Sequence, residues 1–524
     1  MIGSKYKKYY PIIERDKENF EFLLEKINRS TSMEEKLGLA DIASTYATSY
    51  NTGYYTSSVI EKVYTDYAKT INIDISNIQF KENSFLHVLT EGYNTGGHTR
   101  VVERWIENAP SDQMHSVVIL RPNDAKLEDL NKFAKEKNGE CIYYDNSWSI
   151  KEKALKLRQL GMYYQYVILH THMDDPTATI AFGTDEFTRP VLFYNHASHR
   201  FWLGKSITDL HIDLKEKDIV TEEYKDIKKK FNLGIPTKSL DFNTIDKAEF
   251  RKQFDFPIDK KIIISAGSNA KYKPICNDNF IDVLLKLVDD NTYIYVIGAK
   301  KNSKLWENAY KKSNGHIVAL GYIDFDHDYL KYIGMADLYL DSYPMNGWTA
   351  TIDAVTMNVP VLSLESTLPQ LDYLTATESC CYSKEEIIEK AKKLLKDQSY
   401  AEKLNNDLKN SLIQNQSKEA WCNKINYLLE IAPKKHKVLD LSNENDKNFI
   451  NDLAVMNNLH AKKNEPFMFN KKDINNYLKY GMIYKYQGIK HIFDILSLKK
   501  HGIKTKIIKL FGIEIYKHTR GQKK

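Results

Sequence analysis

Two adjacent glycines and a histidine stand between an apolar run and a helix-like segment early in the chain. Residues 90–105 read TEGYNTGGHTRVVERW and follow the run FLHVL. Gly96 and Gly97 would let backbone N–H groups approach a ligand, and a helix that begins there favours negative charge. His98 is a candidate general base, or a hydrogen-bond partner of a substrate, because a neutral imidazole accepts protons. Arg100 is a candidate phosphate ligand; the competing interpretation is a helix-start histidine without a chemical role.

A lysine follows a second apolar run in a glycine-containing turn. Residues 265–274 read SAGSNAKYKP, and Ser268 and Lys271 lie on the loop after the strand-like KIIISAG. A cation at this point can neutralise a departing pyrophosphate, which a metal ion does in other enzymes. The alternative is an ordinary solvated surface charge.

A third loop leads from a strand into a helix with groups that suit a diphosphate. Residues 336–364 read ADLYLDSYPMNGWTATIDAVTMNVPVLSL. Free N–H groups and hydroxyls at a helix N-terminus bind phosphate, and Asp353, one turn into the helix, could accept hydrogen bonds from ribose. In the alternative, Thr349 is an N-cap and Asp353 offsets the helix dipole. The loop residues are Asn346, Gly347, Trp348 and Thr349.

Histidine spacings raise the question of a metal. His196 and His199, and likewise His170 and His172, are close enough in sequence to suggest zinc. No matching cysteine or glutamate cluster accompanies them. We therefore expect these histidines to bond to protein partners, and we expect no metal or other cofactor.

The elements that must position these residues follow an alternating pattern. Short apolar runs alternate with amphipathic stretches, which predicts an α/β protein with two tandem, doubly wound, Rossmann-like domains. Ligands should bind at the carboxyl ends of the strands, in a cleft between the two halves, with Arg100, His196 and His199 at its mouth. The predicted strands cover 85–89, 116–120, 141–144, 166–170 and 191–194, then 261–267, 293–298, 316–321, 338–343 and 359–364.

Changes in the spacing of apolar and charged residues along the chain predict four segments. Helical spacing predicts an all-helical cap over 1–80, followed by an acceptor-side Rossmann-like domain over 81–240. A nucleotide-sugar-binding domain is predicted over 241–432. The remaining 433–524 is predicted to be a basic helical tail, in which apolar residues alternate with lysines over 499–524 and could lie on an anionic membrane.

The composition limits the class of protein to which this chain can belong. A hydrophobic content of 42% in 524 residues indicates a folded protein of several domains. The five cysteines are scattered and no apolar stretch is long enough to span a membrane, so we expect a cytoplasmic protein. Peripheral association with the inner face of the plasma membrane is compatible with this expectation. Residues 499–524 hold nine Lys and Arg against Glu514; of the net charge of +6, the rest of the chain therefore carries −2. That near-neutral body predicts no nucleic-acid partner.

The order of the motifs over 260–370 resembles the donor-binding half of GT-B glycosyltransferases, most of all the O-linked N-acetylglucosamine transferase family and bacterial surface-glycan transferases. The resemblance implies that Lys271 contacts the nucleotide diphosphate and Asp353 the ribose, with Ser268 also on the donor side. It implies that the base lies against Ile323, Asp324 and Tyr329. The loop of Asn346, Gly347, Trp348 and Thr349 would cup the phosphates, although Trp348 stands where the family usually has histidine.

The resemblance implies a glycosyltransferase that needs no metal and moves a hexosyl or N-acetylhexosaminyl group from a nucleotide sugar, UDP-linked in the first instance. The expected acceptor is a glycan or lipid-linked saccharide, with protein as an alternative. The absence of a glutamate pair around the phosphate loop favours inversion. In this fold Gly96 and Gly97 would leave room for the donor sugar beside His98. A nucleotide-sugar epimerase and a non-catalytic scaffold remain alternatives, and an oligomer is compatible with either.

Overall fold

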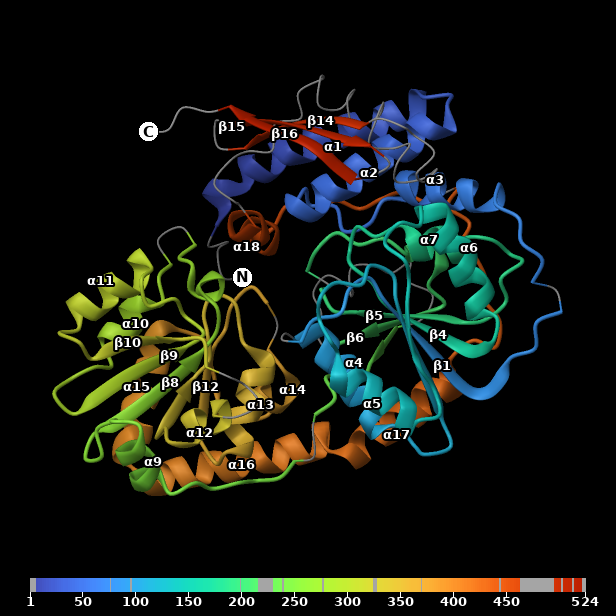
Figure 1. Cartoon of the computed structure of the whole chain (residues 1–524). Helices are drawn as coiled ribbons and strands as arrows, with labels where there is room; N and C mark the ends of the chain where they lie inside the picture. Colours follow the sequence, from blue (N-terminus) through green and yellow to red (C-terminus); the bar gives the residue numbers. More distant parts are fainter. Residues whose placement is uncertain are drawn as a thin grey trace. The chain divides into compact units, whose positions relative to one another are not determined.

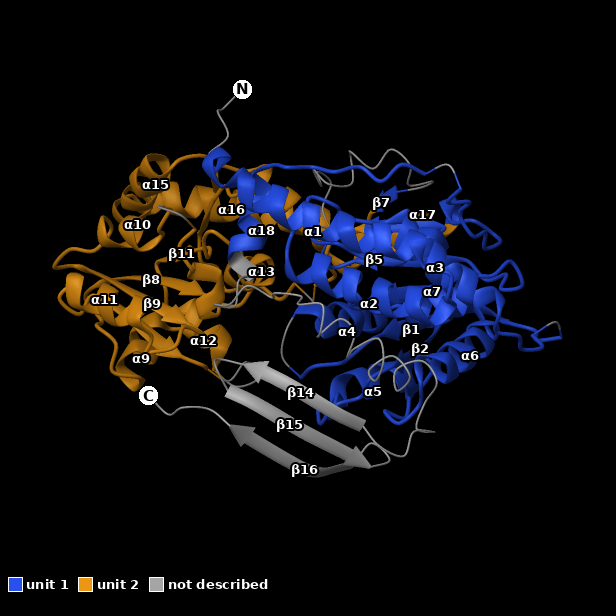
Figure 2. Ribbon diagram, turned by 90° about the horizontal axis from the view of Figure 1, so that it is seen from above, with its two compact units in different colours: residues 1–212, 224–231, 430–524 blue, residues 213–223, 232–429 orange. Residues whose placement is uncertain are grey.

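The computed structural model divides the chain into two compact units (Figures 1 and 2). Unit 1 comprises 1–212, 224–231 and 430–524, and unit 2 comprises 213–223 and 232–429. The structure describes 6–461 except 76, 95–96, 198, 215–229, 238–239, 276–277, 324–327, 369 and 443, and it describes the backbone of 494–500, 503–510 and 513–520.

The first sheet has seven strands in the order β3-β2-β1-β4-β5-β6-β7. The predicted alternation is confirmed here, because β1 pairs in parallel with both β2 and β4, and β4 with β5. Apolar side chains fill the centre of the sheet, as expected for strands covered on both faces. The strands are β1 (Lys81–Leu89), β2 (Met114–Ile119), β3 (Cys141–Tyr143), β4 (Tyr164–His170), β5 (Val191–Asn195), β6 (Leu210–Asp213) and β7 (Lys230–Asn232).

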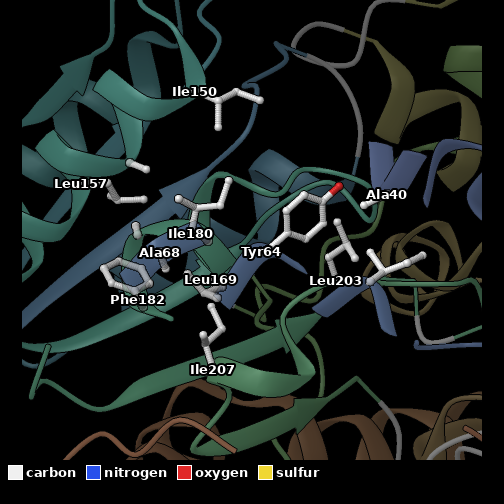
Figure 3. Packing of buried hydrophobic residues seen from close by; sticks show 14 of the residues in the cluster. Ala40, Tyr64, Ala68, Ile150, Leu157, Leu169, Ile180, Phe182, Leu203 and Ile207 are labelled. Carbon is white, nitrogen blue, oxygen red and sulfur yellow. The ribbon is translucent and has the colours of Figure 1, made fainter. Parts of the chain in front are cut away.

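The predicted N-terminal helices are present, and they share a core with this sheet. Tyr64 and Ala68 of the third helix lie in one buried cluster with Leu169 of β4 and Phe182 (Figure 3). Burial of apolar surface between helices and sheet is the main favourable contribution to such a core. The helices of unit 1 are α1 (Tyr10–Arg29), α2 (Met33–Ser49), α3 (Ser58–Lys69), α4 (Gly97–Asn108), α5 (Glu128–Glu136), α6 (Ile150–Gly161), α7 (Thr177–Phe182) and α18 (Asp452–Ala461).

Local sequence signals set several helix starts. Ser149 and Glu152 form a capping box at α6, in which the serine side chain accepts from the Glu152 N–H and the glutamate accepts from the Ser149 N–H. Ser57 caps α3 by accepting from the Ile60 N–H. Such caps satisfy backbone donors that the helix itself leaves open.

The second sheet has six strands in the order β10-β9-β8-β11-β12-β13. β8 pairs in parallel with β9 and β11, so this half also confirms the predicted doubly wound arrangement. Its strands are β8 (Lys261–Ala266), β9 (Thr292–Ile297), β10 (Ile317–Gly321), β11 (Leu338–Leu340), β12 (Val361–Leu364) and β13 (Cys380–Cys381). Its helices are α9 (Lys247–Gln253), α10 (Ile281–Leu285), α11 (Lys304–Lys312), α12 (Tyr329–Gly334), α13 (Trp348–Thr356), α14 (Asp372–Thr375), α15 (Lys384–Lys396), α16 (Gln398–Gln416) and α17 (Lys418–Ile431).

The first part of the predicted tail is tied to unit 1. The ring of His436 bonds to Asp209 Oδ2 at 2.6 Å and to the Phe182 carbonyl at 2.9 Å. Asn458 of α18 donates to Asp16 Oδ2 of α1 at 2.6 Å. This segment therefore contributes buried polar contacts to the unit that begins the chain.

The prediction of a helical C-terminal stretch was wrong for the residues that the structure describes there. They form an antiparallel sheet of β14 (Asp494–Lys500), β15 (Ile503–Leu510) and β16 (Ile513–Arg520). The physical reason is visible in KTKIIKL and IEIYKHTR, where β-branched and aromatic residues alternate with polar ones at the period of a strand. Among the described helices, none combines the length and the apolarity needed to cross a membrane.

Candidate functional site

A buried carboxylate organises the carboxyl edge of the second sheet. Asp341 follows β11 directly and is fully buried. Its Oδ1 accepts from the backbone N–H of Ser342 at 2.8 Å and of Gly347 at 2.7 Å. Its Oδ2 accepts from Asn346 Nδ2 at 3.1 Å and from Ser363 Oγ at 2.9 Å. Both oxygens are therefore used as acceptors, and they fix the shape of the loop that leads into α13.

Two residues predicted to contact phosphate hold this loop together. Gly347 carries no side chain because a Cβ there would lie 2.9 Å from Asp341 Oδ1. The side chain of Asn346 is buried and accepts from Ser366 Oγ at 2.8 Å while its amide donates to Asp341. The Gly347 N–H and the Asn346 side chain thus point into the protein and position the residues that follow.

Lys271 is anchored to the same loop. Its Nζ donates to the Asn346 carbonyl oxygen at 3.0 Å. Burial lowers the pKa of Lys271, and the negative charge of Asp341 opposes that effect. Conversely, burial raises the pKa of Asp341, and Lys271 with the hydrogen-bond donors opposes it. The pair places a cation next to the loop, with its counter-charge buried behind it.

Helix α13 begins at this point and directs its first turn toward the loop. Gly347 is its N-cap residue, and no side chain caps the helix there. Trp348 and Thr349 form the half-buried first turn, and Asp353 is half-buried one turn later. Uncapped N–H groups and the helix dipole favour an anion at such an end. Because Lys271 is bonded to the residue before Gly347, cation and helix end occupy one locality.

The remaining donor-side predictions lie on neighbouring segments of unit 2. Ser268 is exposed, and its carbonyl accepts from the Lys271 N–H at 2.9 Å. Ile323 is half-buried after β10, and Tyr329 is buried at the start of α12. Residues 324–327 between them lie outside the described part of the chain, so the proposed contact with a base stays a prediction.

His98 stands in the first turn of α4 with a defined protonation pattern. Its Nε2 lies 2.8 Å from the backbone carbonyl oxygen of His170. Because a carbonyl can only accept, Nε2 carries the proton and Nδ1 of the neutral ring is a lone pair. Burial lowers the pKa of His98 to about 4, so the ring is neutral at physiological pH. Nδ1 has no hydrogen-bond partner within the described residues, and the atom itself is buried.

Of the two glycines before His98, the structure describes Gly97. A Cβ on Gly97 would meet no atom within 4 Å, so the position is open in the described structure. Gly96 lies outside the described residues. The loop is tied to the helix by Thr99 Oγ1, which accepts from the Tyr93 N–H at 2.9 Å.

The predicted histidines are bonded to protein partners. His170 Nδ1 lies 2.9 Å from His196 Nε2, and His172 Nδ1 lies 3.3 Å from Arg121 Nη2, which confirms the expectation of partner-bonded rings. Arg100 and His199 are half-buried. Among the described residues, no group of three or more His, Cys, Asp or Glu side chains is arranged to hold a metal ion.

Sequence reasoning missed two sets of residues. It did not single out Asp341, although a lone acid directly after a buried strand was a usable signal. It also missed His87 and His115, which stand inside the apolar runs FLHVL and HSVVI. Polar residues on strands buried on both faces need bonded partners, and that requirement was the available signal.

Comparison with known proteins gives fold likeness without sequence likeness. No protein family and no curated protein matches the chain by sequence. HepE from Anabaena, in complex with UDP-glucose, is 10% identical with a TM-score of 0.52, covering 66% of this chain and 99% of its own. A glycosyltransferase from Rickettsia africae is 11% identical with a TM-score of 0.50, covering 67% and 98%. Sucrose-phosphate synthase from Thermosynechococcus elongatus is 14% identical with a TM-score of 0.50, covering 66% and 98%.

These likenesses show that the two sheets and their helices adopt the GT-B fold, as the sequence predicted. A fold hosts many activities, so function must be argued from the residues of the site.

Proposed function

We propose that the chain is a glycosyltransferase that moves a hexosyl or N-acetylhexosaminyl group from a UDP-sugar to a glycan or lipid-linked saccharide, with inversion and without a metal ion. The observation that carries the proposal is the Lys271 ammonium bonded to the carbonyl that precedes the uncapped start of α13. The UDP-glucose bound by HepE supports a UDP donor.

The donor's diphosphate is proposed to bind in unit 2. Lys271 supplies one positive charge, and α13 supplies the positive end of its helix dipole, at an N-terminus that no side chain caps. Asp341 does not face the phosphates; it holds Gly347 and Asn346 so that the loop is already formed before the donor arrives. A preformed site avoids the entropy cost of ordering the loop on binding.

His98 of unit 1 is proposed to act as the base once substrate binding exposes its Nδ1, which is buried in the described structure. The acceptor hydroxyl gives its proton to His98 Nδ1 while its oxygen forms a bond to the anomeric carbon of the sugar. The bond from that carbon to the diphosphate oxygen breaks, and the electron pair leaves with the diphosphate. Lys271 stabilises the added negative charge on the leaving group. Attack on the face opposite the leaving group inverts the anomeric carbon.

The experiment that tests this function is a thermal-shift screen of UDP-, GDP-, ADP- and CDP-sugars, followed by detection of released nucleoside diphosphate. We expect one nucleotide family to raise the melting temperature and its sugar to be lost with formation of free diphosphate. Free diphosphate excludes an epimerase, which returns an intact nucleotide sugar. Failure of every nucleotide to bind would contradict the proposal and leave a scaffold role.

A lipid-linked acceptor would require the chain to meet a membrane surface, and the basic C-terminal stretch is the proposed contact. Its nine Lys and Arg favour anionic lipid by ~1 kcal/mol for each charge near the surface. A variant with Lys504, Lys506 and Lys509 changed to Glu should lose sedimentation with phosphatidylserine vesicles. The matched control changes the exposed Lys300, Lys301 and Lys304 to Glu. Equal loss in both variants would contradict a specific contact.

A further inference from the structure

Four histidines of unit 1 form one continuous chain of hydrogen bonds. His115 Nδ1 lies 2.9 Å from His87 Nε2, and His87 Nδ1 lies 3.0 Å from His170 Nε2. His170 Nδ1 in turn lies 2.9 Å from His196 Nε2. The far end is closed by Gln113 Oε1, 3.2 Å from His115 Nε2. Every link joins the Nδ1 of one ring to the Nε2 of the next, so the chain has a direction.

The register of the parallel strands explains this arrangement. His115 pairs with Phe85, two residues before His87, and His170 pairs with Leu89, two residues after His87. Side chains two residues apart on a strand lie on the same face. The chain therefore crosses one face of the sheet diagonally and advances by two residues at each strand toward the carboxyl edge, where ligands of such sheets bind.

The rings are neutral, which makes their tautomers interdependent. Burial lowers the pKa of His87 to about 3 and lowers the pKa values of His115, His170 and His196 well below their ordinary range. A neutral imidazole has one N–H and one lone pair. Because Gln113 Oε1 only accepts, His115 donates through Nε2 and offers Nδ1 to the next ring, and each following ring repeats that pattern.

The His196 end of this chain of hydrogen bonds is consistent with the same direction of donation. Within the described part of the protein, the only hydrogen bond of the His196 ring is the one to His170, and the residue is half-buried. An unpartnered lone pair on Nδ1 is less costly than an unpartnered N–H. The ring of His98 lies against that of His196, with centroids 4.4 Å apart. The Nδ1 of His98 is also a lone pair, because its Nε2 donates to the His170 carbonyl.

We propose that this chain of hydrogen bonds, anchored at Gln113, fixes the tautomer of His196 so that its Nδ1 is presented as a proton acceptor to a hydroxyl group of a sugar acceptor. The inference rests on the proposed function, to which it adds a second substrate-contacting residue. His196 would contact the acceptor directly. Gln113, His115, His87 and His170 would act through it as positioning residues.

The first test needs no variant. Imidazole nitrogens of the full-length protein, labelled with ¹⁵N-histidine, are recorded at pH 7, and methyl β-glucoside is then titrated as a hydroxyl probe. We expect His196 to carry a proton on Nε2 and none on Nδ1, and we expect its Nδ1 signal to move with the glucoside. A proton on His196 Nδ1, or a glucoside that leaves the His196 Nδ1 signal unmoved, would overturn the proposal.

The second test distinguishes a positioning role of His87 from a purely structural role. In His87→Leu the chain is cut, whereas in His87→Gln an amide can accept from His170 and donate to His115. We expect His87→Leu to give mixed tautomers at His196 and at least a fivefold weaker response to the glucoside, and we expect His87→Gln to restore the single tautomer. Loss of the glucoside response in both variants with the tautomer of His196 unchanged would contradict the proposal.

His316→Gln, in unit 2 and outside the chain of histidines, is the control, since the His316 ring bonds to the Thr292 carbonyl and stacks on Tyr293. The tautomer measurement also distinguishes the two proposals. Wrong tautomers with intact release of nucleoside diphosphate would remove this inference alone. Correct tautomers, with glucoside binding but no cleavage of any nucleotide sugar, would remove the proposed transfer while the hydroxyl site remained.

Discussion

The carboxyl edges of the two sheets are built from opposite kinds of polar group. In unit 2 a buried carboxylate, Asp341, fixes a loop and faces the cation Lys271. In unit 1 the edge is made of neutral imidazoles, with the lone pair of His98 Nδ1 held in place by a backbone carbonyl. Charges suit an anionic ligand, whereas neutral rings suit hydroxyl groups and proton transfer.

The difference teaches that two sheets of the same kind can carry polar groups of opposite character at their carboxyl edges. Burial acts on both edges, but its effect depends on the partner available. Burial raises the pKa of Asp341, and its hydrogen-bond donors and Lys271 oppose that rise. The histidines have no compensating carboxylate among the causes of their shifts, so burial lowers their pKa values and keeps them neutral.

Lowering the pH should produce the largest difference in stability between the two sheets. Each buried histidine whose folded pKa lies below the unfolded value of 6.5 takes up its proton only on unfolding. The free energy of unfolding should therefore be intact above pH 6.5 and fall below it, by ~1.4 kcal/mol per pH unit for each such ring until its folded pKa is reached. Hydrogen exchange between pH 7 and 5 should show β1 and β4 losing protection before β8 and β9. Simultaneous loss in both sheets would contradict this.

His98→Ala tests whether the neutral edge carries the base. We expect turnover to fall ~10²-fold or more, because general base catalysis contributes that much, while donor affinity is kept. Rates of nucleoside diphosphate release and donor affinities by calorimetry measure the two quantities. In the intact protein, the acid limb of the rate should lie near pH 4 and not near 6.5, since only the neutral ring accepts a proton. Wild-type turnover in the variant would assign His98 to structure.

Lys271→Met tests whether the charged edge binds the phosphates. We expect the affinity for the nucleoside diphosphate to weaken by ~1.5–3 kcal/mol, the usual range for a hydrogen bond to a charged group. The exposed Lys300→Met in the same unit is the matched control for loss of one positive charge. Calorimetry that finds the same weakening in both variants would point to the overall charge and away from a specific contact.

Gly347→Ala tests how tightly the charged edge is built. An added Cβ would lie 2.9 Å from Asp341 Oδ1, and the glycine cannot move away without breaking its N–H bond to that oxygen. We expect the free energy of unfolding to fall by ~1–3 kcal/mol, as for other overpacked sites. Gly97→Ala, where a Cβ meets no atom within 4 Å, is the control in urea unfolding. A loss of stability at Gly97 equal to that at Gly347 would contradict the contrast.

The sequence predicted the alternating elements well because hydrophobic period and strand length are local properties. The runs around Ile263 and Val296 are strands, and the segment from Trp348 opens a helix, as predicted. The prediction for the C-terminal stretch failed because lysines spaced among apolar residues were interpreted with a helical period. The segment IEIYKHTR instead follows the period of a strand. The roles of Lys271 and His98 stay predictions, now with defined partners.

By itself, the sequence determined the two α/β halves, the helical N-terminus and the turns that carry Lys271 and His98, since each depends on residues close in the chain. Only the tertiary structure decided which nitrogen of His98 is a lone pair, why position 347 excludes a side chain, and that histidines from three strands and a following turn form one chain. These features depend on strand register and on contacts between residues far apart in sequence. Such contacts are set by how the sheet assembles and leave no local pattern.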